Sequence, residues 1–113
     1  NFSGPKFLAS AGNYIWVAST SGSKLTKVNK SDGTVASTVT LTSSPDETAF
    51  DGTYLWVLLT NGKIARVDSS DAVTYSSSAI CATASGNDVI SASSQYVVVS
   101  CWNGNSFYVI DKL

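Results

Sequence analysis

The chain has 113 residues, a hydrophobic content of 43%, a charged content of only 13% and a formal net charge of -1. This charge balance offers no electrostatic surface for nucleic acid or for an anionic membrane, and no apolar run reaches the roughly 18 residues of a membrane span. The first residue is Asn1 and no basic, apolar leader follows it. We therefore expect a mature or excised segment of single-domain size, without nucleic-acid binding or membrane insertion.

A repeat of about 40 residues dominates the sequence. The segment 12–17 (GNYIWV) recurs at 52–57 (GTYLWV) and, more loosely, at 94–99 (SQYVVV). Each copy is followed by a polar turn and a second apolar segment, which reads LTKVN at 25–29, IARVD at 64–68 and FYVID at 107–111. Such a period, filled with short β-rich segments, is typical of β-propeller blades. We assign repeat 1 to residues 5–44, repeat 2 to 45–86 and the incomplete repeat 3 to 87–113.

Turn residues divide the repeats into strands. Repeat 1 predicts strands at 5–9, 14–20, 24–29 and 34–41, and repeat 2 predicts strands at 47–50, 54–60, 63–68 and 73–80. Repeat 3 predicts only three, at 89–92, 96–101 and 107–111. The sequence thus predicts an all-β fold of about three four-stranded antiparallel blades, the last one incomplete, with essentially no helix. A small independent β-sandwich is the alternative.

The central strands indicate how the blades are buried. Residues 54–59 are apolar at every position, which predicts that both faces of this strand are covered. Trp16 and Trp56 recur at the same place in their repeats, so we expect them to pack between blades rather than to contact a ligand. The outer faces of the first and last blades need a cover as well. The chain is therefore expected to be part of a longer propeller or a subunit of a head-to-tail ring, with other blades or copies of itself as partners.

The residues that follow Pro45 resemble a known repeat. The pattern Pro45-x-x-x-Ala-Phe-Asp-Gly-x-Tyr-Leu-Trp-Val, followed by Lys-Ile-Ala-Arg-Val-Asp at 63–68, is similar to the repeat of bacterial NHL, YVTN and streptogramin-lyase-like propellers. The resemblance implies a propeller over nearly the whole chain. It implies no single activity, because such blades occur in lyases, lactonases, surface-layer proteins and phage or adhesive modules.

Few residues offer conventional catalytic chemistry. Streptogramin lyases rely on histidine, and this chain has none. With only two cysteines as well, it offers no histidine triad, no usual zinc site and no haem ligands, so we expect no metal and no cofactor. Asn29, Asp68 and Asp111 share one position after the third strand of each repeat. We expect them to hydrogen-bond their own turns rather than to bind calcium or act as acid or base.

Trp102 is the best candidate for a binding residue. It follows the predicted strand 96–101 and lies in the polar turn Trp102-Asn103-Gly-Asn105-Ser, where an aromatic ring can stack on a sugar or anchor a partner; packing on a neighbouring loop is the alternative. Propeller geometry predicts that this turn shares a face with residues 21–24, 43–46, 61–63 and 81–87, whereas Asp51, Asp68 and Asp71 lie on the opposite face. The predicted ligand-binding cluster comprises Trp102, Asn103, Asn105, Asn61 and Lys63.

Cys81 ends the predicted fourth strand of repeat 2 and Cys101 lies at the end of the predicted strand 96–101 of the next blade; the strand directions place both toward the same face. A disulfide between them is geometrically allowed, with two buried free thiols as the alternative. A disulfide, together with 20 serines and 11 threonines, favours an extracellular, cell-surface or virion location.

These observations favour a non-catalytic recognition or structural β-propeller module of an extracellular, surface or phage-like assembly, binding carbohydrate or protein. Polar, uncharged loops beside an exposed aromatic suit such contacts and supply no general base. The alternative is a fragment of a lyase- or lactonase-like propeller enzyme whose catalytic residues lie outside this segment.

Overall fold

The structure is a computed structural model that describes residues 4–82 and 88–111. These residues form eleven β-strands in three antiparallel sheets, with no helix in either described range. The first sheet contains β1 (Pro5–Ala11), β2 (Tyr14–Ser19), β3 (Lys24–Asn29) and β4 (Val35–Thr40). The second contains β5 (Pro45–Phe50), β6 (Leu55–Leu59), β7 (Ile64–Val67) and β8 (Val73–Tyr75), and the third contains β9 (Val89–Ala92), β10 (Tyr96–Cys101) and β11 (Ser106–Asp111).

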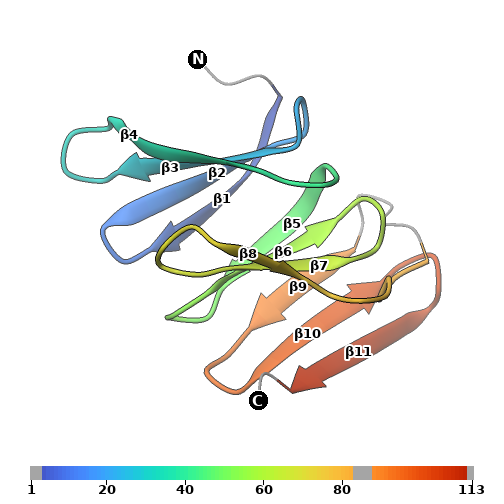
Figure 1. Ribbon diagram of the computed structural model, residues 1–113. Helices are drawn as coiled ribbons and strands as arrows, with labels where there is room; N and C mark the ends of the chain where they lie inside the picture. Colours follow the sequence, from blue (N-terminus) through green and yellow to red (C-terminus); the bar gives the residue numbers. More distant parts are fainter. Residues whose placement is uncertain (1–3, 83–87, 112–113) are drawn as a thin grey trace.

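Each sheet is one propeller blade in which spatial order follows chain order. The orders are β1-β2-β3-β4, β5-β6-β7-β8 and, from the other edge, β11-β10-β9. The first strands lie side by side, with β1 against β5 and β5 against β9, so the three sheets fan out from a common inner edge (Figure 1). The sequence prediction of an all-β fold with two four-stranded blades and an incomplete third is therefore confirmed.

Two hydrophobic cores fill the spaces between the blades. The core between blades 1 and 2 includes Trp16, and the core between blades 2 and 3 includes Trp56. Strand β6 supplies both, because Leu55, Val57 and Leu59 belong to the first core and Trp56 and Leu58 to the second. All five residues of β6 are buried, as its continuous apolar sequence predicts. Fully burying a side chain such as Val or Leu contributes about 1.5–3 kcal/mol, so these contacts hold the blades together.

Blade 3 presents an apolar outer face. In β10 the odd-numbered Val97, Val99 and Cys101 are buried, whereas Tyr96 and Val98 are exposed. Cross-strand pairing places further exposed apolar residues beside them, with Val109 opposite Val98. We call this surface the blade-3 face; its exposed apolar residues are Val89, Tyr96, Val98, Phe107 and Val109.

The fourth strand of repeat 2 is shorter than predicted. We expected a strand over 73–80, but β8 ends at Tyr75. At the next residue the Ser76 N–H still donates to the Ile64 carbonyl (2.8 Å), but the Ile64 N–H donates to the Ser76 hydroxyl (3.0 Å) in place of a backbone carbonyl. The same hydroxyl donates to the Ser78 carbonyl (2.8 Å). The other bounds agree with the predictions to within two residues. Residues 83–87 of the predicted 81–87 loop lie outside the described ranges.

Candidate functional site

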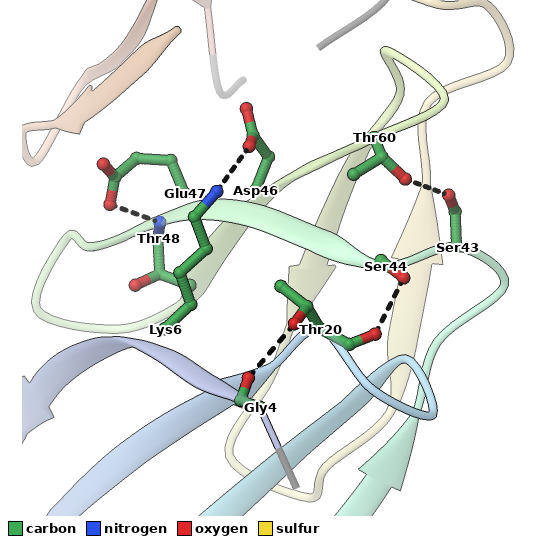
Figure 2. Close-up of polar contacts among 9 residues, drawn as sticks. All are labelled: Gly4, Lys6, Thr20, Ser43, Ser44, Asp46, Glu47, Thr48 and Thr60. Atoms are coloured by element: carbon green, nitrogen blue, oxygen red, sulfur yellow. Dashed lines mark hydrogen bonds and ion pairs between the residues drawn. The ribbon is translucent and has the colours of Figure 1, made fainter. Parts of the chain in front are cut away.

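The turns after the second strand of each blade and the connections between blades form one side of the molecule, which we call the loop face. Hydrogen bonds join them: Thr20 Oγ1 donates to the Gly4 carbonyl (3.2 Å), and Ser44 Oγ donates to the Thr20 carbonyl (3.0 Å). The Ser43 and Thr60 hydroxyls are 2.8 Å apart (Figure 2). This arrangement agrees with the predicted face for residues 43–46 and their neighbours.

Trp102 begins the turn between β10 and β11 and is 65% exposed. Its backbone is held firmly: the Trp102 N–H donates to Oδ1 of the buried Asp88 (2.6 Å), and the Asn105 N–H donates to the Trp102 carbonyl (3.2 Å). Asn105 has a φ of 46°, in the left-handed region that Asn tolerates better than most residues. The turn therefore presents an exposed indole from a fixed backbone.

A shallow hollow of about 230 Å³ lies beside Trp102. Trp102 and Asn105 both line it, and Phe107, 71% exposed, adds a second aromatic ring. An aromatic surface edged by amide and hydroxyl groups can stack on an apolar sugar face or receive a partner's side chain. The complete lining is Ser100, Cys101, Trp102, Asn105, Ser106 and Phe107.

The other predicted site residues lie outside this hollow. Asn103 is exposed on the same turn but does not line it. Asn61 and Lys63 form the β6–β7 turn, in which Asn61 Oδ1 accepts a hydrogen bond from the Lys63 N–H (3.0 Å). Between them, the Gly62 carbonyl accepts hydrogen bonds from the N–H groups of Ile80 (2.7 Å) and Cys81 (3.2 Å).

The Cys81–Cys101 disulfide connects these turns. Its Cα atoms are 5.6 Å apart, within the ordinary range, so the structure contains the bond that the strand directions allow. Cys81 lies against the Gly62 carbonyl, and Cys101 immediately precedes Trp102. The Trp102 turn is thus linked to Cys81 by the disulfide, and Cys81 is linked to the Asn61 turn by its hydrogen bond to Gly62.

Sequence reasoning missed a set of charged residues at the start of the first strands. Asp46 is the second residue of β5 and Asp88 immediately precedes β9; the strand pairing makes the two positions equivalent, and both residues are buried. Asp46 Oδ1 pairs with Lys6 Nζ at 3.2 Å, which joins blades 1 and 2 (Figure 2). The available signal was the repeated Asp, which follows Pro45 in one repeat and Asn87 in the next.

On the opposite face lie the turns in which we predicted that Asp side chains hydrogen-bond the turn backbone. Asp68 Oδ1 accepts hydrogen bonds from the N–H groups of Ser70 (2.8 Å) and Ala72 (3.0 Å) and from the Ser70 hydroxyl (2.7 Å). These hydrogen bonds lower the pKa of Asp68; the Ser70 hydroxyl has the largest effect and the Ala72 N–H the next largest. In the β3–β4 turn the Thr34 hydroxyl and N–H lower the pKa of Asp32. The turn-stabilising interpretation of Asp68 is confirmed.

Asp71 connects blade 2 to blade 1 on this side. Its Oδ1 lies 2.9 Å from Lys27 Nζ, and its Oδ2 accepts a hydrogen bond from the Ser37 hydroxyl (2.6 Å). Lys27 also lies over the rings of Tyr14 (4.5 Å) and Trp16 (5.3 Å). These contacts satisfy both charges and describe a junction between blades.

Within residues 4–82 and 88–111, no group of three or more His, Cys, Asp or Glu residues is arranged to hold a metal ion. None of these residues belongs to a helix long and apolar enough to cross a membrane.

Solved structures share this architecture at low sequence identity. Hydrazine synthase from Kuenenia stuttgartiensis superposes with a TM-score of 0.81 and 20% identity over 99% of this chain and 34% of its own. The Cps50 (Swd1) β-propeller domain from Myceliophteria thermophila gives a TM-score of 0.73 and 9% identity over 99% of this chain and 37% of its own. BamB from Moraxella catarrhalis gives a TM-score of 0.69 and 16% identity over 93% of this chain and 33% of its own.

No family model and no curated protein matches the sequence. The chain spans about a third of the length of the three structures, which are similar to it in fold. Together with the three fanned sheets, they establish a β-propeller module of consecutive blades. The finer resemblance to NHL, YVTN and streptogramin-lyase-like repeats stays a prediction.

Proposed function

We propose that this β-propeller module is a non-catalytic recognition element of an extracellular, surface or phage-like assembly, and that it binds carbohydrate or protein through the Trp102 turn. The observation that carries the proposal is the exposed Trp102 ring on a turn fixed by Asp88 and the Cys81–Cys101 disulfide. A rigid backbone reduces the entropy lost on binding, so an exposed indole on it can contribute strongly to affinity.

The polar character of the turn fits these ligands. Asn103, Asn105 and Ser106 follow Trp102 in the chain and offer hydrogen-bonding groups that carry no charge. Sugars present both hydroxyl groups and apolar ring faces, and a protein partner presents backbone amides beside apolar side chains. Asn61 and Lys63 extend the candidate surface through the disulfide-linked neighbouring turn.

We further propose an extracellular location for the module and its assembly with neighbouring blades. The disulfide and the abundance of Ser and Thr support an oxidising environment outside the cytosol. The apolar blade-3 face supports contact with other blades or with copies of this chain.

The test is a glycan array combined with pull-down of extracellular proteins, using the parent chain and two variants. Trp102→Ala removes the indole, whereas Val35→Ala shortens an exposed apolar side chain at the start of β4 in blade 1 and serves as the matched control. We expect a ligand whose affinity falls by about tenfold or more in Trp102→Ala, as for a central aromatic anchor, and is unchanged in Val35→Ala. Equal binding by Trp102→Ala and the parent would remove the basis of the proposal.

A further inference from the structure

The three blades differ at one position in the hairpin between their first and second strands. Strand pairing makes Ala11, Asp51 and Ser93 equivalent, because each is the last residue before the turn of its blade. In blade 3 the Ser93 hydroxyl accepts hydrogen bonds from the N–H groups of Gln95 (3.2 Å) and Tyr96 (3.0 Å). Blade 1 has only a methyl group at this position.

Blade 2 places a carboxylate there. Asp51 Oδ1 accepts hydrogen bonds from the N–H groups of Thr53 and Tyr54, both at 2.7 Å. Its Oδ2 accepts a third from the Trp56 indole N–H, also at 2.7 Å. One carboxylate thus satisfies two backbone donors of the turn and the indole of the second strand. Such hydrogen bonds to an ionised acceptor are about twice as strong as those between neutral groups.

The corresponding donors of blade 1 have no side-chain acceptor at this position. They are the N–H groups of Asn13 and Tyr14 and the indole N–H of Trp16, because the repeat aligns residues 12–17 with 52–57. Trp16 is only 4% exposed, yet its indole donates no hydrogen bond within residues 4–82 and 88–111. Buried donors are normally paired, so an unpaired indole indicates a place where an acceptor binds.

A cavity of about 130 Å³ lies beside this position, between blades 1 and 2. Ala11 and Trp16 line it from blade 1, and Phe50, Leu55 and Val67 line it from blade 2 with apolar side chains. A cavity of this size holds about six non-hydrogen atoms, since one of about 150 Å³ holds benzene. The space that opens beside the Ala11 methyl group therefore fits a carboxylate together with a short apolar tail.

Lys27 supplies positive charge to this cavity, which it also lines. Its side chain is only 12% exposed, and its Nζ lies 5.3 Å from the centre of the Trp16 ring and 2.9 Å from Asp71 Oδ1. Asp68 lines the cavity too, but its Oδ1 accepts hydrogen bonds from its own turn. An anion beside Trp16 is thus attracted by Lys27, and burial strengthens this attraction relative to that in water.

We propose that the cavity binds a small organic carboxylate with a short apolar tail, such as propionate. The carboxylate accepts a hydrogen bond from the Trp16 indole N–H and lies near Lys27, so it takes the place that the Asp51 side chain has in blade 2. The tail lies against the apolar wall that blade 2 provides. This site is formed by blades 1 and 2 alone and is independent of the binding proposed for Trp102.

The test titrates sodium propionate into the isotopically labelled 113-residue chain at constant ionic strength and follows the NMR signals of the indole N–H groups. We expect a saturable shift of the Trp16 signal with a Kd of about 10 mM or lower. The Trp56 signal should not shift, because Asp51 already holds that indole. Propionamide has the same shape without the charge, and we expect it to bind about tenfold more weakly or not at all.

Two protein variants add a second arm. Ala11→Asp gives blade 1 the residue that blade 2 has, so we expect the Trp16 signal to be shifted without ligand and the affinity for propionate to fall by about tenfold or more. Ser93→Asp adds the same charge at the equivalent position of blade 3 and should leave the affinity unchanged.

Four results would each overturn the proposal: no saturable shift of the Trp16 signal, an equal shift of the Trp56 signal, equal binding of propionamide, or full binding by a folded Ala11→Asp variant. Tighter binding of the larger acid acetyl-Ala-Ala than of propionate would overturn the assignment of a small free acid as the ligand. The ligand titrations use the unaltered chain, so they decide the question even if Ala11→Asp does not fold.

Discussion

Asp68 illustrates how a single carboxylate can order a turn. The Ser70 hydroxyl and the Ala72 N–H lower its pKa below the ordinary value of 3.8, so the folded state binds a proton less readily than the unfolded state. Its contribution to stability is therefore fully present above the unfolded-state pKa and is lost as the pH falls through the lower folded-state pKa.

We expect Asp68→Asn to be less stable than the parent at pH 7 and to lose less stability between pH 5 and the acid range. Urea unfolding across this pH range measures both effects. The amide keeps an acceptor oxygen but does not titrate, so a change in the pH dependence reports the carboxylate itself. Identical pH profiles for the variant and the parent would contradict this account.

The β6–β7 turn depends on Gly62 for two separate reasons at the scale of the element. Its φ of 80° lies in the left-handed region, and a Cβ at this position would overlap the Cys81 carbonyl oxygen. Gly33 in the β3–β4 turn has a similar φ of 74° but no atom within 4 Å of the corresponding Cβ position. An alanine at Gly33 therefore meets backbone strain alone, whereas an alanine at Gly62 meets backbone strain and a steric clash.

We expect Gly33→Ala to cost about 1 kcal/mol through backbone strain alone. Gly62→Ala should cost about 3 kcal/mol or more, because the turn and the segment that leads to Cys81 must also move apart. Thermal or urea unfolding of the two variants gives the comparison. Equal losses would contradict the close approach of Gly62 to the Cys81 carbonyl.

The disulfide joins the end of blade 2 to the central strand of blade 3. It closes a loop with a sequence separation of 20 residues. Replacing both cysteines by serine should lower the free energy of unfolding by about 3 kcal/mol in the chain-entropy model. Unfolding of the double variant, compared with the oxidised and reduced parent, measures this loss; parent stability that is unchanged by reduction would contradict it.

Strand positions were predictable from this sequence because the repeat supplies three aligned copies of each turn and each apolar segment. The end of β8 could not be predicted, because residues 76–78 contain no Gly, Pro, Asn or Asp to mark a turn. The strand ends where the Ser76 hydroxyl accepts a hydrogen bond from Ile64, 12 residues away along the chain. The candidate site was predicted only in part. The exposed Trp102 follows from its polar turn, but its anchor Asp88 lies 14 residues away along the chain and becomes a neighbour only after folding.

The whole molecule is a row of blades whose inner faces are well packed and whose outer faces are not. The face of blade 2 that contains Trp56 and Leu58 is covered by blade 3. The corresponding face of blade 3 contains Val98 and Phe107, which are exposed. Repeat proteins cover such faces with neighbouring units, so other blades or copies of this chain are the expected partners.

Sedimentation velocity of the 113-residue chain over a concentration series, with circular dichroism on the same samples, tests this claim most directly. We predict concentration-dependent association, with Val98→Asp shifting the equilibrium toward smaller species because it places a charge in the apolar blade-3 face. A parent chain that remains a stable, fully folded monomer throughout the series would contradict the proposal that these blades require a cover.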